Sequence, residues 1–315
     1  MPTALQPATK PTMHFIGVTT GQSSINAVFP LWAERLGLGD CVLHGIDFAP
    51  GSPAADYRAA LEFIRRDPLS LGALVTTHKV AVFNAGGDLF DELDPLTRAI
   101  GEVGSIFKRG GRLHGRAVDP WTSGHALAAQ IDATHWQGGA EALILGAGGA
   151  GTAFAWRLAN AEATAGRPAR IHVVDRVSAR LAHLRTLHAS WLGAAPLEVH
   201  LATRPEDADA VLSRLPAGSL VANATGLGKD APGSPLSAAA QFPERGVVWE
   251  FNYRGQLVFL EQARAQEAAR GLRIADGWTY FLHGWTHVIA DVFDCAIPTA
   301  GPLFDDLGRI AAAAR

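Results

Sequence analysis

Apolar residues in the first part of the chain follow two alternating patterns. Short runs rich in apolar residues occur at "MHFIGVTT", "CVLHGIDF" and "LGALVTTHK", and the first two are followed by "INAVFPLWAERLGLG" and "AADYRAALEFIRRD". A short apolar run is typical of a buried strand, whereas apolar residues three or four positions apart are typical of an amphipathic helix. This order of strands and helices predicts a parallel sheet covered by helices.

The alternation starts again near residue 141 with "EALILGAGGAGTAFAWRLANAE", followed by strand patterns at "ARIHVVDR", "LEVHLAT", "SLVANAT" and "GVVWEFN". We therefore predict an α/β protein with two domains. Residues 1–119 form an α/β substrate-binding and catalytic domain, and residues 120–276 form a doubly wound, Rossmann-type dinucleotide-binding domain. The stretch "GWTYFLHGWTHVIADVF" predicts a helix, and we expect residues 277–315 to pack back on the first domain.

Composition narrows the class of protein. The 315 residues are 48% hydrophobic and 18% charged, which is typical of a globular enzyme. A formal net charge of −3 argues against nucleic-acid binding, which needs a dense basic face. Only Cys41 and Cys295 are present, and we find no signal-peptide pattern and no apolar run of about 18 residues. We therefore expect a cytoplasmic protein without a membrane span.

A glycine-rich motif directly follows the first strand of the second domain. In it, the first glycine allows a tight turn, the second lets the backbone approach a diphosphate, and the third permits close packing of helix on strand. The strand–turn–helix context favours dinucleotide binding over a glycine-rich connection that binds nothing. The predicted cofactor-binding residues here are Gly146, Ala147, Gly148, Gly149, Ala150 and Gly151.

Two residues at the end of the next strand bear on which dinucleotide binds. Asp175 occupies the place where a carboxylate accepts hydrogen bonds from the ribose hydroxyls and repels a 2′-phosphate. Arg176 follows it, and a guanidinium there can bind that phosphate, stack on the adenine or remain solvated. We predict NAD as the cofactor and leave NADP open.

Several separated motifs together resemble the shikimate/quinate dehydrogenase family, with altered substrate motifs. The resemblance runs from Gly17 to Phe293, and its motifs occur in the family's order: "GVTTGQSSIN", "LVTTHK", "GEVGSI", "GRAVDPWTSG", "GAGGAG", "NATGLG", "EFNYRG" and "DGWTYFLHG". The resemblance implies an enzyme that reversibly oxidises a ring hydroxyl to a ketone on a small cyclic hydroxy acid, as in aromatic amino acid biosynthesis.

The resemblance implies that Lys79 and Asp119 form the catalytic pair. Desolvation disfavours the charged form of a lysine, and a neighbouring carboxylate offsets part of that effect, so such a pair can exchange a proton near neutral pH. A lysine at a strand end can also simply extend to water, and an aspartate before a proline can be a turn or helix-capping residue. The match of both residues to the family motif favours the catalytic role.

Further roles follow from the resemblance alone. It implies that Ser23 and either Thr76 or Thr77 bind the substrate, with Tyr253 close to substrate and nicotinamide. It also implies cofactor contacts, which we expect from Thr225, Gly226, Leu227 and Gly277.

The substrate motifs also depart from the family pattern. Ile25, Leu74, Gly104, Ala117 with Val118, and Gly284 stand where the family has polar side chains. Each lost partner of a buried polar group costs about 1–3 kcal/mol. A set of aromatic residues suggests a different substrate or binding pose, although each can equally be core; the set is Trp121, Trp278, Tyr280, Phe281 and Trp285.

The altered motifs leave open an inactive dinucleotide-binding sensor of the same fold, and an enzyme acting on another substrate, such as an amino-substituted analogue. His283 and His287 are four residues apart, but without a third ligand we predict no metal site there. For the oligomeric state, the expectation to test is a homodimer.

Overall fold

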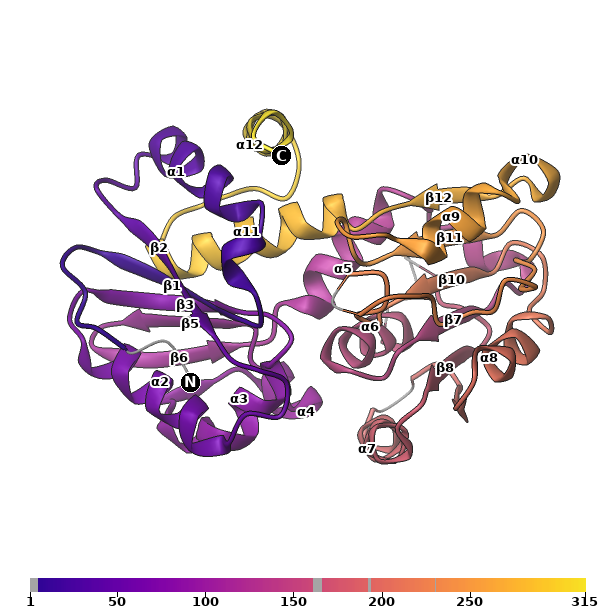
Figure 1. The fold of residues 1–315 in the computed structure, drawn as a ribbon, viewed down its shortest axis with the longest axis horizontal. Coiled ribbons are helices and arrows are strands. Elements are labelled where there is room, and N and C mark those ends of the chain that lie inside the picture. Colours follow the sequence, from indigo (N-terminus) through magenta and orange to yellow (C-terminus); the bar gives the residue numbers. More distant parts are fainter. Residues whose placement is uncertain (1–4, 161–165, 192–193, 230) are drawn as a thin grey trace. The chain divides into compact units, whose positions relative to one another are not determined.

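The computed structural model describes residues 5–160, 166–191, 194–229 and 231–315. The chain forms two compact units, Met1–Val118 with Gly284–Arg315, and Asp119–His283 (Figure 1). The α/β class and the Rossmann-type second unit predicted from the sequence are confirmed. In the described part of the chain, no helix has both the length and the apolar character needed to cross a membrane.

The first unit contains a mixed sheet with the strand order β2-β1-β3-β5-β6-β4. Its strands are β1 (Thr12–Gly17), β2 (Val42–Asp47), β3 (Ser70–Val75), β4 (Glu92–Leu93), β5 (Ser105–Arg109) and β6 (Arg112–Arg116). The strand pairs β1–β2 and β1–β3 are parallel, but β3–β5 and β5–β6 are antiparallel. The sequence did not predict the β5–β6 hairpin, whose turn is Gly110–Gly111 with both φ angles positive.

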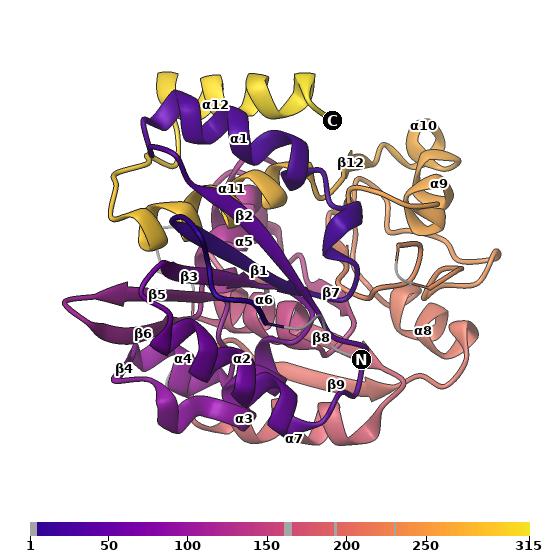
Figure 2. The same cartoon turned by 60° about the vertical axis from the view of Figure 1, so that its left-hand side comes forward.

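Helices cover both faces of this sheet. Figures 1 and 2 show α1 and α12 on one face and α2 and α3 on the other. Trp32 of α1 donates a hydrogen bond from its indole to the Leu307 carbonyl of α12, at 2.9 Å. The helices are α1 (Ile25–Leu36), α2 (Ala54–Arg66), α3 (Lys79–Gly86), α4 (Pro95–Ile100) and α12 (Pro302–Ala313), with short 3-10 turns at Thr20–Gln22 and Gly87–Leu89.

The second unit contains a parallel sheet with the strand order β12-β11-β10-β7-β8-β9. This is the doubly wound Rossmann order, in which a ligand binds where the order reverses, here between β7 and β10. The strands are β7 (Ala142–Leu145), β8 (Ile171–Asp175), β9 (Leu197–Leu201), β10 (Leu220–Asn223), β11 (Val247–Glu250) and β12 (Arg273–Ala275).

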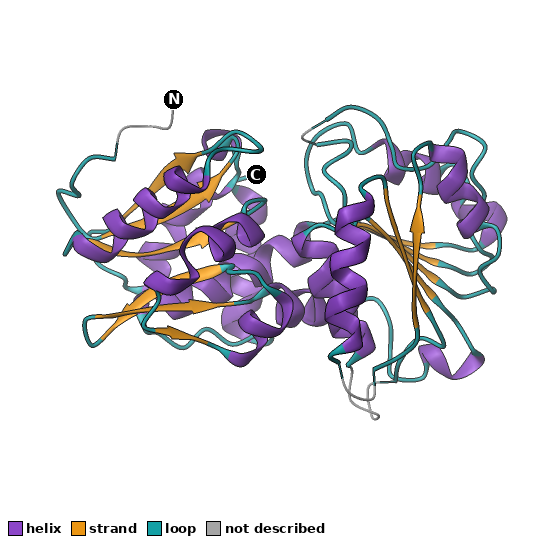
Figure 3. Ribbon diagram, turned by 90° about the horizontal axis from the view of Figure 1, so that it is seen from below, coloured by secondary structure: helices purple, strands orange, loops and turns teal. Residues whose placement is uncertain are grey.

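Helices cover both faces of the sheet of the second unit, as Figure 3 shows. Leu143 and Val221 pack with Phe259 in one core, whereas Phe154 contacts Trp249 on the other side with ring centroids 5.2 Å apart. The helices are α5 (Asp119–Ala128), α6 (Gly149–Ala159), α7 (Ser178–Ala189), α8 (Pro205–Leu212), α9 (Val258–Arg264) and α10 (Glu267–Arg270), with a 3-10 turn at His135–Gly138.

The long helix α11 (Trp278–Phe293) confirms the helix predicted near the C-terminus. It begins in the second unit, and from Gly284 onward its residues belong to the first unit. In the first unit, Trp285 of this helix is buried against Phe15 of β1, with ring centroids 4.8 Å apart.

Candidate active site

The turn between β7 and α6 has a shape that fits a diphosphate. Gly146 has a φ of 107°, and an added Cβ at Gly151 would overlap the carbonyl oxygen of Gly146. At Gly148 an added Cβ would meet no described atom within 4 Å, so the chain leaves space there. The first N–H groups of a helix such as α6 lack carbonyl partners within the helix and attract anions. The geometry therefore fits the dinucleotide site that the motif predicts.

Asp175, at the end of β8, holds this turn in place. Its buried carboxylate accepts hydrogen bonds from the N–H groups of Ala147, at 2.7 Å, and Val177, at 2.8 Å. The guanidinium of Arg180 lies 3.7 Å from the same carboxylate, and Arg176 is exposed. Each oxygen of Asp175 thus already accepts one backbone hydrogen bond, a structural role that the sequence did not reveal. Its contact with a ribose stays a prediction.

A buried polar network shapes the turn after β10. Asn223 accepts hydrogen bonds from the N–H and hydroxyl of Thr225, at 3.0 and 2.6 Å, and Asn252 donates to the Thr225 carbonyl at 3.0 Å. Glu250 accepts from the Asn223 amide at 2.6 Å and from the backbone and side chain of Asn252 at 2.8 and 2.6 Å. The network therefore fixes the segment that contains the predicted nicotinamide contacts Thr225, Gly226 and Leu227.

Glu250 itself is fully buried, which raises its pKa from 4.5 to about 7. The three N–H donors and the charge of Lys229 act in the opposite direction, and burial outweighs them. Glu250 is not among the site residues predicted from the sequence. The available signal was an acidic residue within the apolar run "GVVWEFN", at the start of the motif "EFNYRG".

Gly277 and Tyr253 lie close to the end of β11. An added Cβ at Gly277 would overlap the Phe251 carbonyl oxygen, and the Gly277 N–H donates to the Asn252 carbonyl at 3.1 Å. Tyr253 packs against Phe281, with ring centroids 4.6 Å apart. Gly277 is therefore required by backbone packing, whether or not it also approaches a nicotinamide.

The turn that leads to Lys79 differs from the predicted strand end. Strand β3 stops at Val75, the His78 N–H donates to the Thr76 carbonyl, and Thr77 has a positive φ of 52°. This is a γ-turn, a tight three-residue reversal. Lys79 then begins helix α3. The prediction that "LGALVTTHK" is strand throughout was wrong, because the chain turns sharply at Thr77, before Lys79.

His78 anchors this turn in the core of the first unit. Its Nε2 donates to the Phe48 carbonyl at 3.0 Å, so in the neutral ring Nδ1 accepts from the Tyr57 hydroxyl, also at 3.0 Å. Burial lowers the pKa of His78, which favours this neutral form. Lys79 is fixed from its other side, because its carbonyl accepts from the Val103 N–H at 3.2 Å.

The predicted substrate residues of the first unit lie on well-fixed backbone. Ser23 is buried and ends the 3-10 turn Thr20–Gln22. The Asn26 side chain donates to the carbonyls of Thr20 and Ser23, at 2.8 and 3.0 Å. The Thr76 N–H donates to the Ile16 carbonyl at 2.9 Å, which places Thr76 beside the end of β1.

Two of the altered substrate positions, Gly104 and Val118, lie next to each other in the first unit. A Cβ added at Gly104 would lie 2.9 Å from Cγ2 of Val118, so these positions, at which the family has polar side chains, face one another. Val118 is buried, and Leu74 on β3 is also buried. This part of the first unit is therefore apolar, where the resemblance implies hydrogen-bonding side chains.

The aromatic residues singled out from the sequence lie in different local surroundings. Trp278 stacks on Phe281 with centroids 4.9 Å apart, and Tyr280 packs on Phe251 at 5.0 Å. Trp121 is 43% exposed, and Trp285 is core of the first unit. Trp278 and Phe281 lie next to the predicted site residue Tyr253.

Asp119 opens α5 and is buried, and its carbonyl accepts a hydrogen bond from the Ser123 hydroxyl at 2.6 Å. Asp119 belongs to the second unit and Lys79 to the first. Their pairing therefore stays a prediction.

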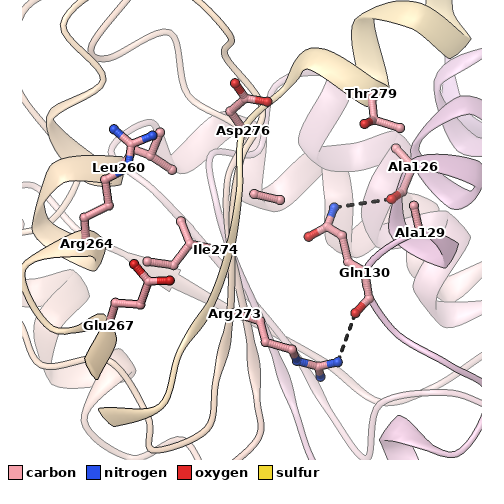
Figure 4. A pocket seen from close by; sticks show the side chains of 11 residues that line it. Ala126, Ala129, Gln130, Leu260, Arg264, Glu267, Arg273, Ile274, Asp276 and Thr279 are labelled. Carbon is pink, nitrogen blue, oxygen red and sulfur yellow. Dashed lines mark hydrogen bonds between the residues drawn. The ribbon is translucent and has the colours of Figure 1, made fainter. Parts of the chain in front are cut away.

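A pocket of about 570 Å³ lies in the second unit beside β12, and Figure 4 shows Arg273 there donating to the Gln130 carbonyl, at 3.0 Å. None of the predicted site residues lines it, so it does not support a substrate site. Its lining consists of Ala126, Ala129, Gln130, Leu260, Arg264, Glu267, Arg273, Ile274, Ala275, Asp276 and Thr279.

A Rossmann-type unit with a glycine-rich turn at the switch point of its sheet defines a two-unit dinucleotide-binding α/β protein. No protein-family model matches the chain. It is 31% identical over 245 residues to the shikimate dehydrogenase (NADP(+)) of Symbiobacterium thermophilum, and the match covers 76% of each protein. The chain belongs to the shikimate dehydrogenase family.

Solved structures of this family share the fold. The shikimate 5-dehydrogenase of Thermus thermophilus, in complex with NADP(H) and shikimate, has a TM-score of 0.68 at 22% identity, covering 96% of this chain and 99% of that one. The quinate dehydrogenase of Corynebacterium glutamicum, in complex with NAD, has a TM-score of 0.67 at 20% identity, with the same coverage.

Proposed function

We propose that the chain is an NAD(P)-dependent dehydrogenase that interconverts a ring hydroxyl and a ketone on a small cyclic carboxylic acid, such as shikimate, quinate or an analogue. The observation that carries this proposal is the glycine-rich turn at the switch point of the second unit, in a chain that belongs to the shikimate dehydrogenase family. The fixed turn before Lys79 adds a candidate base in the first unit.

In the proposed reaction, the chain's own residues move the proton and hold the substrate. Neutral Lys79 takes the hydroxyl proton through Nζ while the carbon–hydrogen bond breaks, and Asp119 orients the resulting ammonium. The bound dinucleotide supplies the hydride acceptor. In the reverse direction, Lys79 returns the proton to the ketone oxygen.

The substrate itself should differ from shikimate in the groups it presents. Ser23, Thr76 and Thr77 retain hydroxyl groups suited to a carboxylate, whereas Gly104 and Val118 offer no side-chain hydrogen bond. We therefore expect a preference for a ring that lacks one hydroxyl or carries an apolar substituent at the matching position.

The cofactor preference rests on the end of β8. The Asp175 carboxylate favours NAD, but it already accepts two backbone hydrogen bonds and lies 3.7 Å from Arg180. Arg176 and Arg180 supply two cationic groups suited to a 2′-phosphate. We propose that the enzyme uses both dinucleotides. The double variant R176A/R180A should lower kcat/KM for NADP at least tenfold and leave that for NAD within twofold, whereas equal losses would refute this assignment.

The experiment that tests the function is a screen of polyhydroxylated cyclohexane and cyclohexene carboxylic acids with each dinucleotide, followed at 340 nm in both directions. Turnover of at least one acid supports the proposal. Dinucleotide binding without turnover of any of these acids contradicts it and favours a sensor of the same fold. Size-exclusion chromatography of the same sample tests the expected homodimer.

A further inference from the structure

A group of ligating side chains lies on the second unit at the edge of the sheet, apart from the predicted cofactor site. Strands β8 and β9 are parallel, with His172 opposite Glu198 and Val174 opposite His200. Because strand side chains alternate between faces, His172, Glu198 and His200 all lie on one face. Glu141, which directly precedes β7, lies beside them. The glycine-rich turn, in contrast, follows the carboxyl end of β7.

The distances between these groups suit one small cation. Nδ1 of His172 lies 3.1 Å from Nε2 of His200, and Oε2 of Glu198 lies 3.7 and 4.0 Å from these two nitrogens. Zinc binds imidazole nitrogen and carboxylate oxygen at about 2.0–2.2 Å in a tetrahedron, so its ligand atoms are about 3.3–3.5 Å apart. Oε2 of Glu198 is slightly farther from the two nitrogens than this spacing, and a small rotation of the Glu198 side chain brings it to the distance of a third zinc ligand.

A fourth residue orients the central histidine. Nε2 of His172 lies 2.9 Å from Oε2 of Glu141, to which it can only donate a hydrogen bond. In the neutral ring, Nδ1 then carries the lone pair that faces His200. A carboxylate that holds the distal N–H of a ligating histidine is a recurrent feature of zinc sites.

Charges of both signs surround the group. Glu141 and Glu198 each contribute a negative charge, Arg170 contacts both of them, and Arg185 and Arg214 interact electrostatically with His200. Arg170 pairs with Oε1 of Glu198, so Oε2 is the oxygen that faces the histidines. His172 is mostly enclosed, with 12% of its side chain exposed, whereas Glu198 is 46% exposed and leaves an entry path for an ion.

We propose that His172, Glu198 and His200 form a binding site for a zinc-class divalent cation that links β8 to β9, with Glu141 as its positioning residue. Among the described residues, these three bring their ligand atoms within 4.8 Å of one another. Two imidazoles and one carboxylate are a donor set suited to zinc, with water as the fourth ligand. The site lies outside the proposed catalytic machinery and fastens the edge strand of the sheet.

The test uses the full chain, purified without a polyhistidine tag and stripped of metal. Co²⁺ titration, followed by visible absorption, reports the coordination number, and competition with Zn²⁺ gives its Kd. We expect one tight site, a four-coordinate Co²⁺ spectrum, and a Tm that rises with Zn²⁺ because the ion binds the folded state. E198Q and H200A should each weaken binding at least tenfold, and E141Q should weaken it about 10–100-fold.

The matched control is H183A, which removes an exposed histidine of α7 outside the group. It should bind Zn²⁺ as the parent does. E198Q alters a half-exposed side chain, so a folded variant is expected, and its circular dichroism and dinucleotide binding verify this. Absence of a Zn²⁺ site tighter than about 100 µM, a six-coordinate Co²⁺ spectrum, or unchanged binding in E198Q and H200A would overturn the proposal.

Discussion

The free energy of unfolding should depend on pH through Glu250. This residue is a fully buried carboxyl at the centre of the network that holds the 223–227 segment. The perturbation is E250Q, which keeps the size of the side chain and removes its titration. Its amide would also place an N–H donor against the donors of Asn223 or Asn252. At low pH we therefore expect the free energy of unfolding of E250Q to be about 1–3 kcal/mol lower than that of the parent.

The magnitude follows from the pKa, which is raised from 4.5 to about 7 in the folded protein. A raised pKa in the folded state means that the protonated form contributes its full stability below pH 4.5, and that this stability is lost as the pH rises through about 7. A shift of this size corresponds to about 3 kcal/mol. The variant lacks this pH dependence. The free energy of unfolding of E250Q, relative to that of the parent, should therefore rise by about 3 kcal/mol between pH 4.5 and 8.

The assay is urea unfolding of parent and variant at matched pH values from 4.5 to 8, because the difference between them cancels the other titrating groups. E244Q serves as the control, since the Glu244 side chain is 69% exposed. For the control, the difference from the parent should stay within about 0.5 kcal/mol, as is usual for a surface substitution. If the difference between E250Q and the parent were equally flat, Glu250 would not titrate in this range and our account of the network would be wrong.

Three further outcomes are expected. G151A should weaken dinucleotide binding at least tenfold in a fluorescence titration, because its Cβ overlaps the Gly146 carbonyl; unchanged affinity would contradict the role of this turn. G284Q should raise kcat/KM for shikimate at least tenfold, because an added Cβ would meet no described atom within 4 Å outside its own helix and the resemblance implies a glutamine at this position; an unchanged value would show that other positions exclude shikimate. T77G should raise the free energy of unfolding by about 0.5–1 kcal/mol, since it removes a side chain from a left-handed conformation, and a destabilised variant would refute this.

Local patterns were sufficient to predict much of the fold. The alternation of strands and helices and the strand–turn–helix context of Gly146 are set by neighbouring residues, and the structure has both. The β5–β6 hairpin was missed although Gly110–Gly111 is a turn signal, because the helix-and-strand alternation favoured a fully parallel sheet.

Features that depend on distant pairing could not be predicted. The helix that begins at Lys79 depends on how His78 is held by Phe48 and Tyr57, which are remote in sequence. The contact between His172 and His200 depends on the register of β8 with β9, which alternation alone does not specify.

The central claim is that Lys79 exchanges the proton in a dehydrogenase reaction, and K79A tests it most directly. With the best acid from the screen, we predict that kcat falls at least a thousandfold while the Kd for the reduced dinucleotide stays within twofold of the parent. K10A, which removes a surface lysine paired with Asp40, should retain full activity. A K79A enzyme that turns over within tenfold of the parent would contradict the account.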